Sequence, residues 1–362
     1  MTGGQVPVGA THMGRCTNIL AVSNYHTTLR NVPPCTHWYL MARFLRWTVL
    51  LLVCALPVQA SAQGYFDQTE LEDLLSVRAE NLDALPEVFY EYYRFDDPRE
   101  NTVLARNTFY KRIGDGGISL GKQRSQLVEL LNRDKMESLE LGDTLVVPTR
   151  WDLDFRAYSP FPRYYTGARN IDKVFIIHKE IQAFAAYEYG QLARWGVVNT
   201  GDPKATETPN GRYNFNWKEE YRVSSLSPPD EDWEMYWVFN FYNARGIHIH
   251  QYAFPTGGPT SHGCVRLIDA DAKWIYSWAD AWKTTVGTTG IGSSQGRLIE
   301  LGTMVLVLGD EPADNPNPFS YKKRYPVLKR INLPPNPYAV PPGTPQQERF
   351  DKLRARNTAP SR

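Results

Sequence analysis

The chain has 362 residues, with 40 basic and 39 acidic side chains, 42% hydrophobic residues and 13% aromatic residues. This length predicts two or three domains with a buried core, and the aromatic content excludes disorder throughout the chain. The formal net charge of +1 gives no field that would attract nucleic acid, so we expect no nucleic-acid partner.

The first 62 residues are predicted to direct export. They hold four arginines and no Asp, Glu or Lys, and a short basic segment that starts at Met41 precedes a mostly apolar run over 47–58. Ala60 and Ala62 then supply the small residues that a signal peptidase reads. A helix of this run rises about 18 Å, which is too short for a bilayer core of about 30 Å. We therefore expect a signal peptide at 41–62, no stable membrane span, and a mature chain that starts near Gln63.

Two alternatives concern this end of the chain. An organellar transit peptide is the competing interpretation, because the stretch is free of acidic residues. Residues 1–40 form a long extension ahead of the signal, and we expect Met41 to be the working start.

Three of the four cysteines lie in the part that would be removed, so Cys264 remains alone. A single thiol in an oxidising compartment is a liability unless it is buried or needed for its reactivity.

The next part of the chain predicts a small α/β module. Residues 63–100 have leucine spacing typical of a helical segment. Residues 123–132 predict another helix, which leads into a polar turn and a β-branched strand that ends at Pro148. This order resembles the second half of a LysM peptidoglycan-binding module, placed at 101–150. The glycine-rich stretch 109–120 shows no clear opening strand and helix. A glycan-binding module and a plain spacer both remain open.

The rest of the chain predicts one mainly β domain. Residues 151–167 are aromatic and contain proline, which suggests a linker. Alternating runs separated by turn signals then predict a compact β-sandwich over 168–309, with one main helix at 269–282 capped by Asp269. The predicted strands are 173–178, 181–187, 192–198, 212–215, 236–242, 246–251 and 304–308.

Three further segments stand out by composition. Residues 216–232 are polar and residues 284–296 are rich in Gly, Ser and Thr, so both are interpreted as insertions. Residues 310–362 contain 11 of the 26 prolines, too many for a core strand or helix, and predict an extended tail or wrapping arm.

One short region gathers the reactive side chains. On the predicted strand 246–251, His248 and His250 alternate with isoleucines and therefore point to one face. Twelve residues, including two prolines and two glycines, separate His248 from Ser261. Such a loop can fold back and bring Cys264 beside a strand histidine. A thiol with a pKa near 8.5 is only about 3% ionised at neutral pH, so a nucleophilic cysteine needs a neighbouring base such as imidazole.

A metal site is the competing interpretation of the same cluster. His248, His250, His262 and Cys264 are four zinc-type ligands. No carboxylate occurs between Gly246 and Leu267 to serve as a base, and His262 and Cys264 are a poor chelating pair in a glycine turn. We therefore predict no metal and no cofactor, with full activity after zinc is removed.

The pattern resembles the signature of the YkuD-type L,D-transpeptidase catalytic domain. Residues 197–201 and 208–213 also resemble that family's turns, and residues 271–276 and 302–305 its helix and closing strand, so the resemblance covers about 168–309. His250 and Asn199 depart from the usual residues. The signature itself is Ile247-His248, the 12-residue gap, and Ser261-His262-Gly263-Cys264-Val265-Arg266-Leu267.

This resemblance implies a cysteine acyltransferase. Cys264 is the implied nucleophile and His248 the implied general base and acid, with the carbonyl of Ile249 orienting the imidazole and no side chain in that role. Backbone N–H groups of Gly263 and Cys264 are the implied oxyanion donors. Arg266 either binds a stem-peptide carboxylate or braces the loop. The other substrate-binding candidates are Ser261 as a hydrogen-bonding loop residue, His262 as a residue that shapes the turn, and His250.

The implied function is an exported peptidoglycan L,D-transpeptidase of the periplasm or cell wall, acting in cell wall biogenesis and cell shape. It forms 3→3 cross-links or attaches a protein to the wall. An L,D-carboxypeptidase or hydrolase with the same nucleophile is the first alternative, because the acceptor pocket decides whether an amine or water takes the acyl group. The insertion 216–232 is a candidate to restrict that pocket. A non-catalytic wall-binding protein is the second, but it leaves the isolated thiol unexplained.

Overall fold

The computed structural model describes residues 68–252, 258–285, 298–312, 318–321 and 324–358, which all belong to one compact unit spanning Ala62–Arg362. The predicted extension 1–40, the predicted signal at 41–62 and most of the predicted insertion 284–296 lie outside the described residues. Among the described residues, no helix combines the length and apolar character that a membrane crossing requires.

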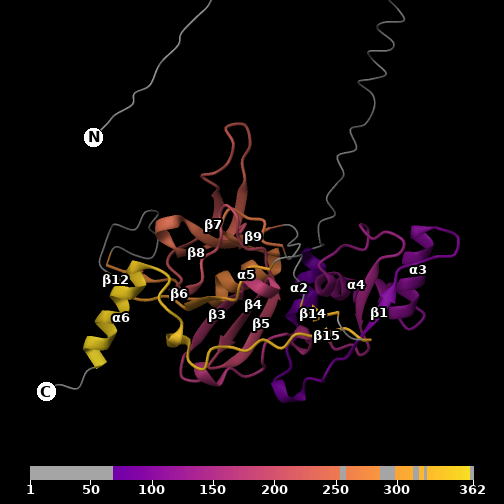
Figure 1. Cartoon of the computed structure of the whole chain (residues 1–362), viewed down its shortest axis with the longest axis horizontal. Helices are drawn as coiled ribbons and strands as arrows, with labels where there is room; N and C mark the ends of the chain where they lie inside the picture. Colours follow the sequence, from indigo (N-terminus) through magenta and orange to yellow (C-terminus); the bar gives the residue numbers. More distant parts are fainter. Residues whose placement is uncertain (1–67, 253–257, 286–297, 313–317, 322–323, 359–362) are drawn as a thin grey trace, which may run out of the picture. The chain divides into compact units, whose positions relative to one another are not determined.

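A five-stranded sheet forms the centre of the fold (Figure 1). Its strand order is β5-β4-β3-β13-β6, with β3 and β13 parallel and the other neighbours antiparallel. Residues alternate across it, because successive side chains of a strand point to opposite faces. Its strands are β3 (Lys173–His178), β4 (Ala183–Glu188), β5 (Gln191–Val197), β6 (Gly211–Asn214) and β13 (Met304–Leu308).

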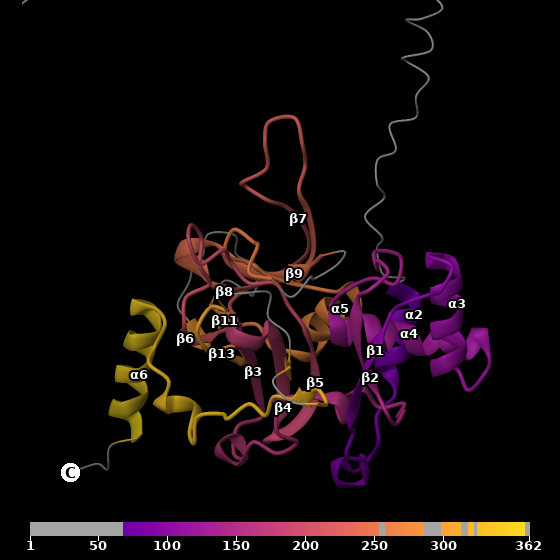
Figure 2. The ribbon, with the colours of Figure 1, turned by 45° about the vertical axis from the view of Figure 1, so that its right-hand side comes forward.

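A second, four-stranded sheet carries the candidate site. Its order is β10-β9-β8-β7, in which only β9 and β10 are parallel. Figure 2 shows the β7–β8 hairpin extending beyond the rest of this sheet. The strands are β7 (Lys218–Val223), β8 (Glu234–Tyr242), β9 (Ile247–Gln251) and β10 (Val265–Leu267).

The two sheets enclose one apolar core. Phe175 and Ile177 on one face of β3 join Phe239 and Ile249 of the second sheet in this core. Helix α5 (Asp269–Trp278) covers it with Ile275 and other buried residues. The predicted mainly β-sandwich class with one main helix is confirmed. The predicted cap is wrong: Ile268 is the N-cap, and the Asp269 carboxylate accepts a hydrogen bond from the indole of Trp237 at 2.8 Å.

The module ahead of the sandwich has the order strand, helix, helix, strand. It consists of β1 (Tyr90–Arg94), α3 (Thr102–Ile113), α4 (Ile118–Asn132) and β2 (Thr144–Pro148), and β1 pairs antiparallel with β2. The sequence analysis found neither the opening strand nor the first helix, and it interpreted 63–100 as helical. That segment instead holds α2 (Gln68–Ser76), the 3₁₀ turn η1 (Leu82–Ala84) and β1.

Glycine in this module permits close helix packing. A Cβ atom on Gly121 would lie 1.9 Å from the backbone oxygen of Tyr110, so no other residue fits between α3 and α4 without moving the backbone. Glycines lower helix propensity, and this is why the stretch 109–120 was not predicted as helix.

The sequence suggested a linker at residues 151–167, but the structure packs this segment against the sandwich. Their aromatic side chains pack into the core on the outer face of the five-stranded sheet, where Tyr158 is fully buried and Phe155 stacks on Trp195 at 4.6 Å. Arg156 and Asp154 form a buried ion pair within the same segment. The prolines shape an irregular segment in which most aromatic residues are buried, while Tyr164 is exposed.

Two other segments also differ from their predictions. The predicted insertion 216–232 contains the regular strand β7, which forms the edge of its sheet and carries charged residues at four of its six positions, as suits an exposed edge. The tail after 310 is partly a wrapping arm, as predicted, since Phe319 and Val340 are buried against the core. It also contains short strands and a helix that its proline content argued against: β14 (Phe319–Ser320), β15 (Val327–Leu328), the 3₁₀ turn η6 (Pro337–Ala339) and α6 (Pro345–Thr358). The remaining described elements are the 3₁₀ turns η2 (Phe155–Tyr158), η3 (Thr166–Ala168), η4 (Lys179–Ile181) and η5 (Asn243–Arg245) and the strands β11 (Lys283–Thr284) and β12 (Leu298–Glu300).

Candidate active site

The parallel pairing of β9 and β10 brings the two halves of the motif together. Val265 lies opposite Ile249 and Arg266 opposite His250 in this ladder. The chain therefore returns along the strand that carries the histidines, and Cys264 comes to lie at the start of β10. Its sulfur is 3.8 Å from the carbonyl oxygen of Gly246, the residue just before β9. The folded-back loop expected from the sequence is present, although residues 253–257 of it lie outside the described part.

Hydrogen bonds hold the turn before Cys264 in a defined shape. The Ser261 hydroxyl donates to the Cys264 carbonyl and accepts from the Gly263 N–H at 3.1 Å. Thr206 and Thr208 donate from their hydroxyls to the carbonyls of Ser261 and Gly263 at 2.9 and 2.8 Å. Gly263 has φ +110°, a conformation that suits glycine. The turn is thus a built structure rather than a free loop.

These bonds change the expected roles of two groups. Because the Gly263 N–H already donates to Ser261, it is not a free oxyanion donor in this structure, contrary to the sequence-based expectation. Ser261 braces the turn, as expected of a hydrogen-bonding loop residue. The stacking of His262 on Trp233, with ring centroids 5.6 Å apart, fits a residue that shapes the turn.

His248 has a side-chain partner that the sequence analysis missed. Asn240, directly opposite His248 across β8 and β9, places its amide nitrogen 3.0 Å from Nδ1 of the imidazole. The same amide donates to the carbonyl of Ile247 at 3.1 Å and accepts from the side chain of Asn216 at 2.7 Å. These two neighbours hold the amide in place beside the ring, and the donor and acceptor roles of Nδ1 follow the tautomer of the imidazole.

This arrangement corrects the expectation that a backbone carbonyl alone orients the ring. Ile249, whose carbonyl oxygen was expected to accept from the ring, has a strand neighbour on each side in the sheet, Phe239 and Val265. The sequence did contain a signal for Asn240, because it is the single polar residue in the apolar run from Trp237 to Tyr242 of a predicted strand. A buried polar side chain in such a run must find a partner.

Burial sets the charge state of the reactive groups. Burial, together with smaller contributions from the charges of His250 and Arg222, lowers the pKa of His248 to about 3. Burial lowers the pKa of His250 to about 4 in the same way. Burial also raises the pKa of the Cys264 thiol, although a hydrogen bond to the backbone of His248 and the charge of Arg266 oppose this rise. At neutral pH the resting site therefore holds a thiol and a neutral imidazole, not an ion pair.

A pocket of about 720 Å³ surrounds these groups. His248, His250, Ser261, His262, Cys264 and Arg266 all line it, together with residues of the β7–β8 hairpin such as Arg222 and Trp233. The sequence motif is thus brought together in one cavity, and the two histidines share it as their alternation predicted. The hairpin residues were not predicted, because their distance from the motif in the sequence gives no signal of contact.

Arg266 is available for an anionic ligand. Its guanidinium stacks on Tyr252 at 4.4 Å, and its Nε atom is buried without a hydrogen-bond partner among the described residues. Arg222 and Arg245 also line the pocket, against the acidic Glu231 and Glu234. A guanidinium with an unused donor favours carboxylate binding in the Cys264 pocket.

The described residues contain no group of three or more His, Cys, Asp or Glu side chains arranged to hold a metal ion. The Nδ1 atoms of His248 and His250 are engaged by Asn240 and by the Gln251 carbonyl, respectively. Full activity without zinc stays a prediction.

The charge state gives a test by alkylation. Iodoacetamide reacts with thiolate, so we expect the rate at Cys264 to rise about tenfold per pH unit through pH 8 and beyond 9, because the raised thiol pKa leaves little thiolate at neutral pH. The rate is measured by mass spectrometry of the Cys264 peptide between pH 5 and 10. A rate that is already constant from pH 6 upward would mean a thiolate–imidazolium pair and would contradict this charge state.

The fold and the pocket together define a β-sandwich domain with a thiol and a neutral histidine in one cavity. Residues 172–307 match the family model of the YkuD L,D-transpeptidase catalytic domain. The resemblance to the YkuD-type L,D-transpeptidase catalytic domain is thus confirmed over these residues. No curated protein matches the chain in sequence.

Solved structures with a similar domain are also L,D-transpeptidases. The enzyme from Stackebrandtia nassauensis is 23% identical, with 39% of this chain and 58% of that chain covered and a TM-score of 0.29. L,D-transpeptidase 3 from Mycobacterium tuberculosis is 20% identical over 38% of this chain and 61% of that one, and the Mycobacterium smegmatis enzyme 18% over 38% and 58%, both with a TM-score of 0.29. The match spans less than two thirds of each of these chains.

Proposed function

We propose that the protein is an exported L,D-transpeptidase that acts on peptidoglycan stem peptides through a thioester at Cys264. The observation that carries the proposal is the shared pocket: the one cysteine outside the predicted export segment lies beside the strand histidine of the family motif, next to a cationic side chain with an unused donor. The family match supports the class of reaction.

In the proposed first half-reaction the Cys264 sulfur attacks the carbonyl carbon of the third residue of a tetrapeptide stem. A carbon–sulfur bond forms, the amide bond to the terminal D-alanine breaks, and the thiol proton passes through His248 to the leaving amine. The free N–H of Cys264 is the proposed oxyanion donor, worth about 3–4 kcal/mol if well placed. Arg266 is the proposed partner of a stem carboxylate.

In the second half-reaction a side-chain amine of another stem attacks the thioester carbonyl. An amide forms, the carbon–sulfur bond breaks, and the amine proton returns through His248 to the thiol. The neutral His248 expected from its low pKa is the state that can accept a proton in each half. Water in place of the amine gives the carboxypeptidase alternative, and an amine on a protein gives attachment to the wall.

Muropeptide analysis tests the proposal. Incubation of the protein with purified tetrapeptide stems should release D-alanine and produce dimers that mass spectrometry assigns as 3→3 cross-links. Tripeptides without dimers would identify the hydrolase instead. If the Cys264 thiol is intact and no product forms, the non-catalytic alternative would be favoured.

A second, smaller proposal concerns the module of β1, α3, α4 and β2. Its strand, helix, helix, strand order includes the opening strand and helix that the sequence analysis missed, which supports the resemblance to a complete LysM module. We propose that it helps to hold the enzyme on glycan strands. Its boundaries are then about 90–148 rather than 101–150.

This proposal predicts a change in sedimentation. The module packs against the sandwich, and Arg133 donates to the Ile181 carbonyl across that contact, so deletion would damage the fold. Exposed residues of the module are the better target. Replacing Lys111 and Arg112 of α3 with Ala should reduce pelleting with insoluble peptidoglycan, while Arg169→Gln, outside the module, should not. Equal pelleting of the three proteins would favour the spacer interpretation.

A further inference from the structure

A second pocket lies away from Cys264, between α2, β5 and α5, and is called here the α2 pocket. Its volume is about 380 Å³, within the range of small-molecule sites. None of its lining residues lines the Cys264 pocket. Four of the lining side chains are cationic and two are acidic: Arg78, Arg156, Arg194 and Lys273 against Glu72 and Asp154.

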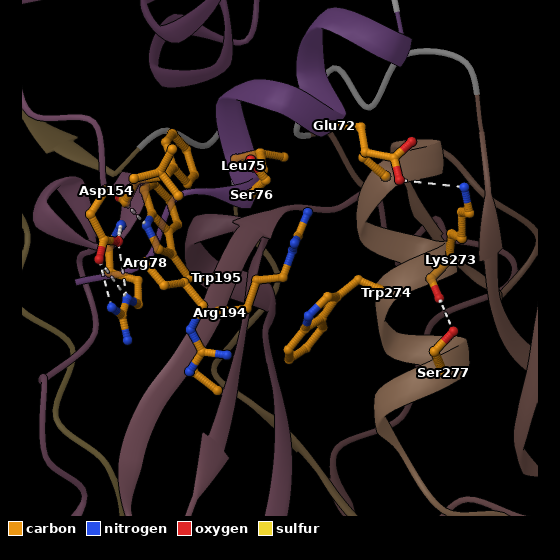
Figure 3. A pocket seen from close by; sticks show the side chains of 15 residues that line it. Glu72, Leu75, Ser76, Arg78, Asp154, Arg194, Trp195, Lys273, Trp274 and Ser277 are labelled. Carbon is orange, nitrogen blue, oxygen red and sulfur yellow. Dashed lines mark hydrogen bonds and ion pairs between the residues drawn. The ribbon is translucent and has the colours of Figure 1, made fainter. Parts of the chain in front are cut away.

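The acidic side chains are already paired at the two sides of the pocket. Asp154 binds Arg156 through both carboxylate oxygens and accepts the Ala79 N–H, and Glu72 pairs with Lys273 at 3.4 Å. Figure 3 shows Asp154 on one side of the pocket and the Glu72–Lys273 pair on the other, with Trp195 and Trp274 between them. Among the described residues, neither carboxylate forms a hydrogen bond or ion pair with Arg78 or Arg194.

Arg194 uses only part of its donor capacity. Its Nε atom donates to the buried Asp271 at 2.6 Å, and its guanidinium lies over the ring of Trp274 at 5.3 Å. The described residues provide no acceptor for its two terminal nitrogens, and neither nitrogen is among the fully buried unpartnered atoms. These donors are thus held in place by Asp271 and Trp274 while they remain open to the pocket.

Arg78 is the second cation with unused donors. It follows α2, is exposed, and has no hydrogen bond or ion pair within the described part of the chain. Burial of part of the side chain and the charge of Arg156 lower its pKa, Glu188 and Asp154 raise it, and repulsion by Arg194 makes the smallest contribution, which lowers it. An anion between Arg78 and Arg194 would relieve this repulsion.

We propose that the α2 pocket binds a small organic carboxylate through Arg78 and Arg194. Two guanidinium groups with free donors match the planar carboxylate, which they can bind in bidentate fashion. The apolar group beside the carboxylate lies against Leu75, Val77 and the edge of Trp274. This site is separate from the reaction proposed at Cys264 and does not depend on it.

Isothermal titration calorimetry of the full chain tests the proposal with N-acetylalanine and its uncharged amide as probes. The carboxylate should bind and the amide should not. Arg78→Gln should weaken binding at least about tenfold, as expected for one lost charge-assisted contact. Arg194→Lys should weaken it as well, because lysine keeps the charge beside Asp271 but loses the terminal fork. Arg169→Gln, an exposed arginine outside the pocket, is the matched control.

Circular dichroism melting curves show whether each variant keeps its fold. Binding that is equal for acid and amide, or unchanged in a folded Arg78→Gln protein, would overturn the proposal. Tighter binding of inorganic phosphate than of N-acetylalanine would also overturn it, because the pocket would then select a tetrahedral anion. Binding of N-acetylalanine by Arg266→Gln at wild-type strength would separate this site from the Cys264 pocket, where Arg266 is the proposed carboxylate partner.

Discussion

Replacing Cys264 with alanine is expected to abolish both release of D-alanine and dimer formation, with a loss on the order of 10⁶-fold because nucleophile and base act as a unit. The side chain lies in a hydrogen-bonded turn at the pocket and is only partly buried, so its loss opens little core. The variant should keep its melting temperature. Muropeptide analysis by mass spectrometry measures the products.

A covalent probe separates loss of the nucleophile from loss of binding. A carbapenem, whose strained lactam resembles the scissile amide, should add its mass to the wild-type protein and not to Cys264→Ala. His248→Ala should lose several orders of magnitude in activity, whereas His250→Ala should retain measurable turnover, because within the described residues the Nδ1 atom of His250 bonds to the Gln251 carbonyl. An equal adduct on both proteins, or an indispensable His250 with a dispensable His248, would contradict the assignment.

The strands of the sandwich were predictable because they are short runs of apolar and β-branched residues between turn signals, and the central strands are buried on both faces. Lys173–His178 and Met304–Leu308 coincide with predicted strands to the residue. The motif also placed His248 and Cys264 correctly in one pocket, because a strand sets the direction of its side chains and a glycine- and proline-rich loop must turn back. These features are local in sequence.

The features that were missed depend on contacts between distant segments. The strand Tyr90–Arg94 exists because it pairs with Thr144–Pro148, about 50 residues later. Its polar and aromatic residues suit a strand of this two-stranded sheet but give no local strand pattern. The aromatic residues of 151–167 are buried by the sheet against which they pack, and no local pattern distinguishes them from a linker. Arg78, which follows α2, and Arg194 of β5 likewise line one pocket only because segments far apart in the sequence come together in the fold.

Asn240 is expected to position His248, and its replacement should reduce turnover more than substrate binding. Asn240→Ala removes the amide 3.0 Å from Nδ1 and frees the ring to rotate. We expect kcat to fall about 100-fold, the scale of a misplaced catalytic group, with KM little changed because Asn240 does not line the Cys264 pocket. Steady-state release of D-alanine measures both constants.

A carboxylate at the same position distinguishes positioning from a structural role. In Asn240→Asp the new group would favour a protonated imidazole, so the low pKa of His248 should rise toward its ordinary value. The imidazolium would then stabilise the Cys264 thiolate, and alkylation by iodoacetamide should become measurable at neutral pH and less dependent on pH. A merely structural asparagine would leave the alkylation profile of folded Asn240→Asp like that of the wild type. That result, or an unchanged kcat in Asn240→Ala, would contradict the positioning role of Asn240. The assignment of Cys264 as nucleophile is tested separately, by the carbapenem adduct.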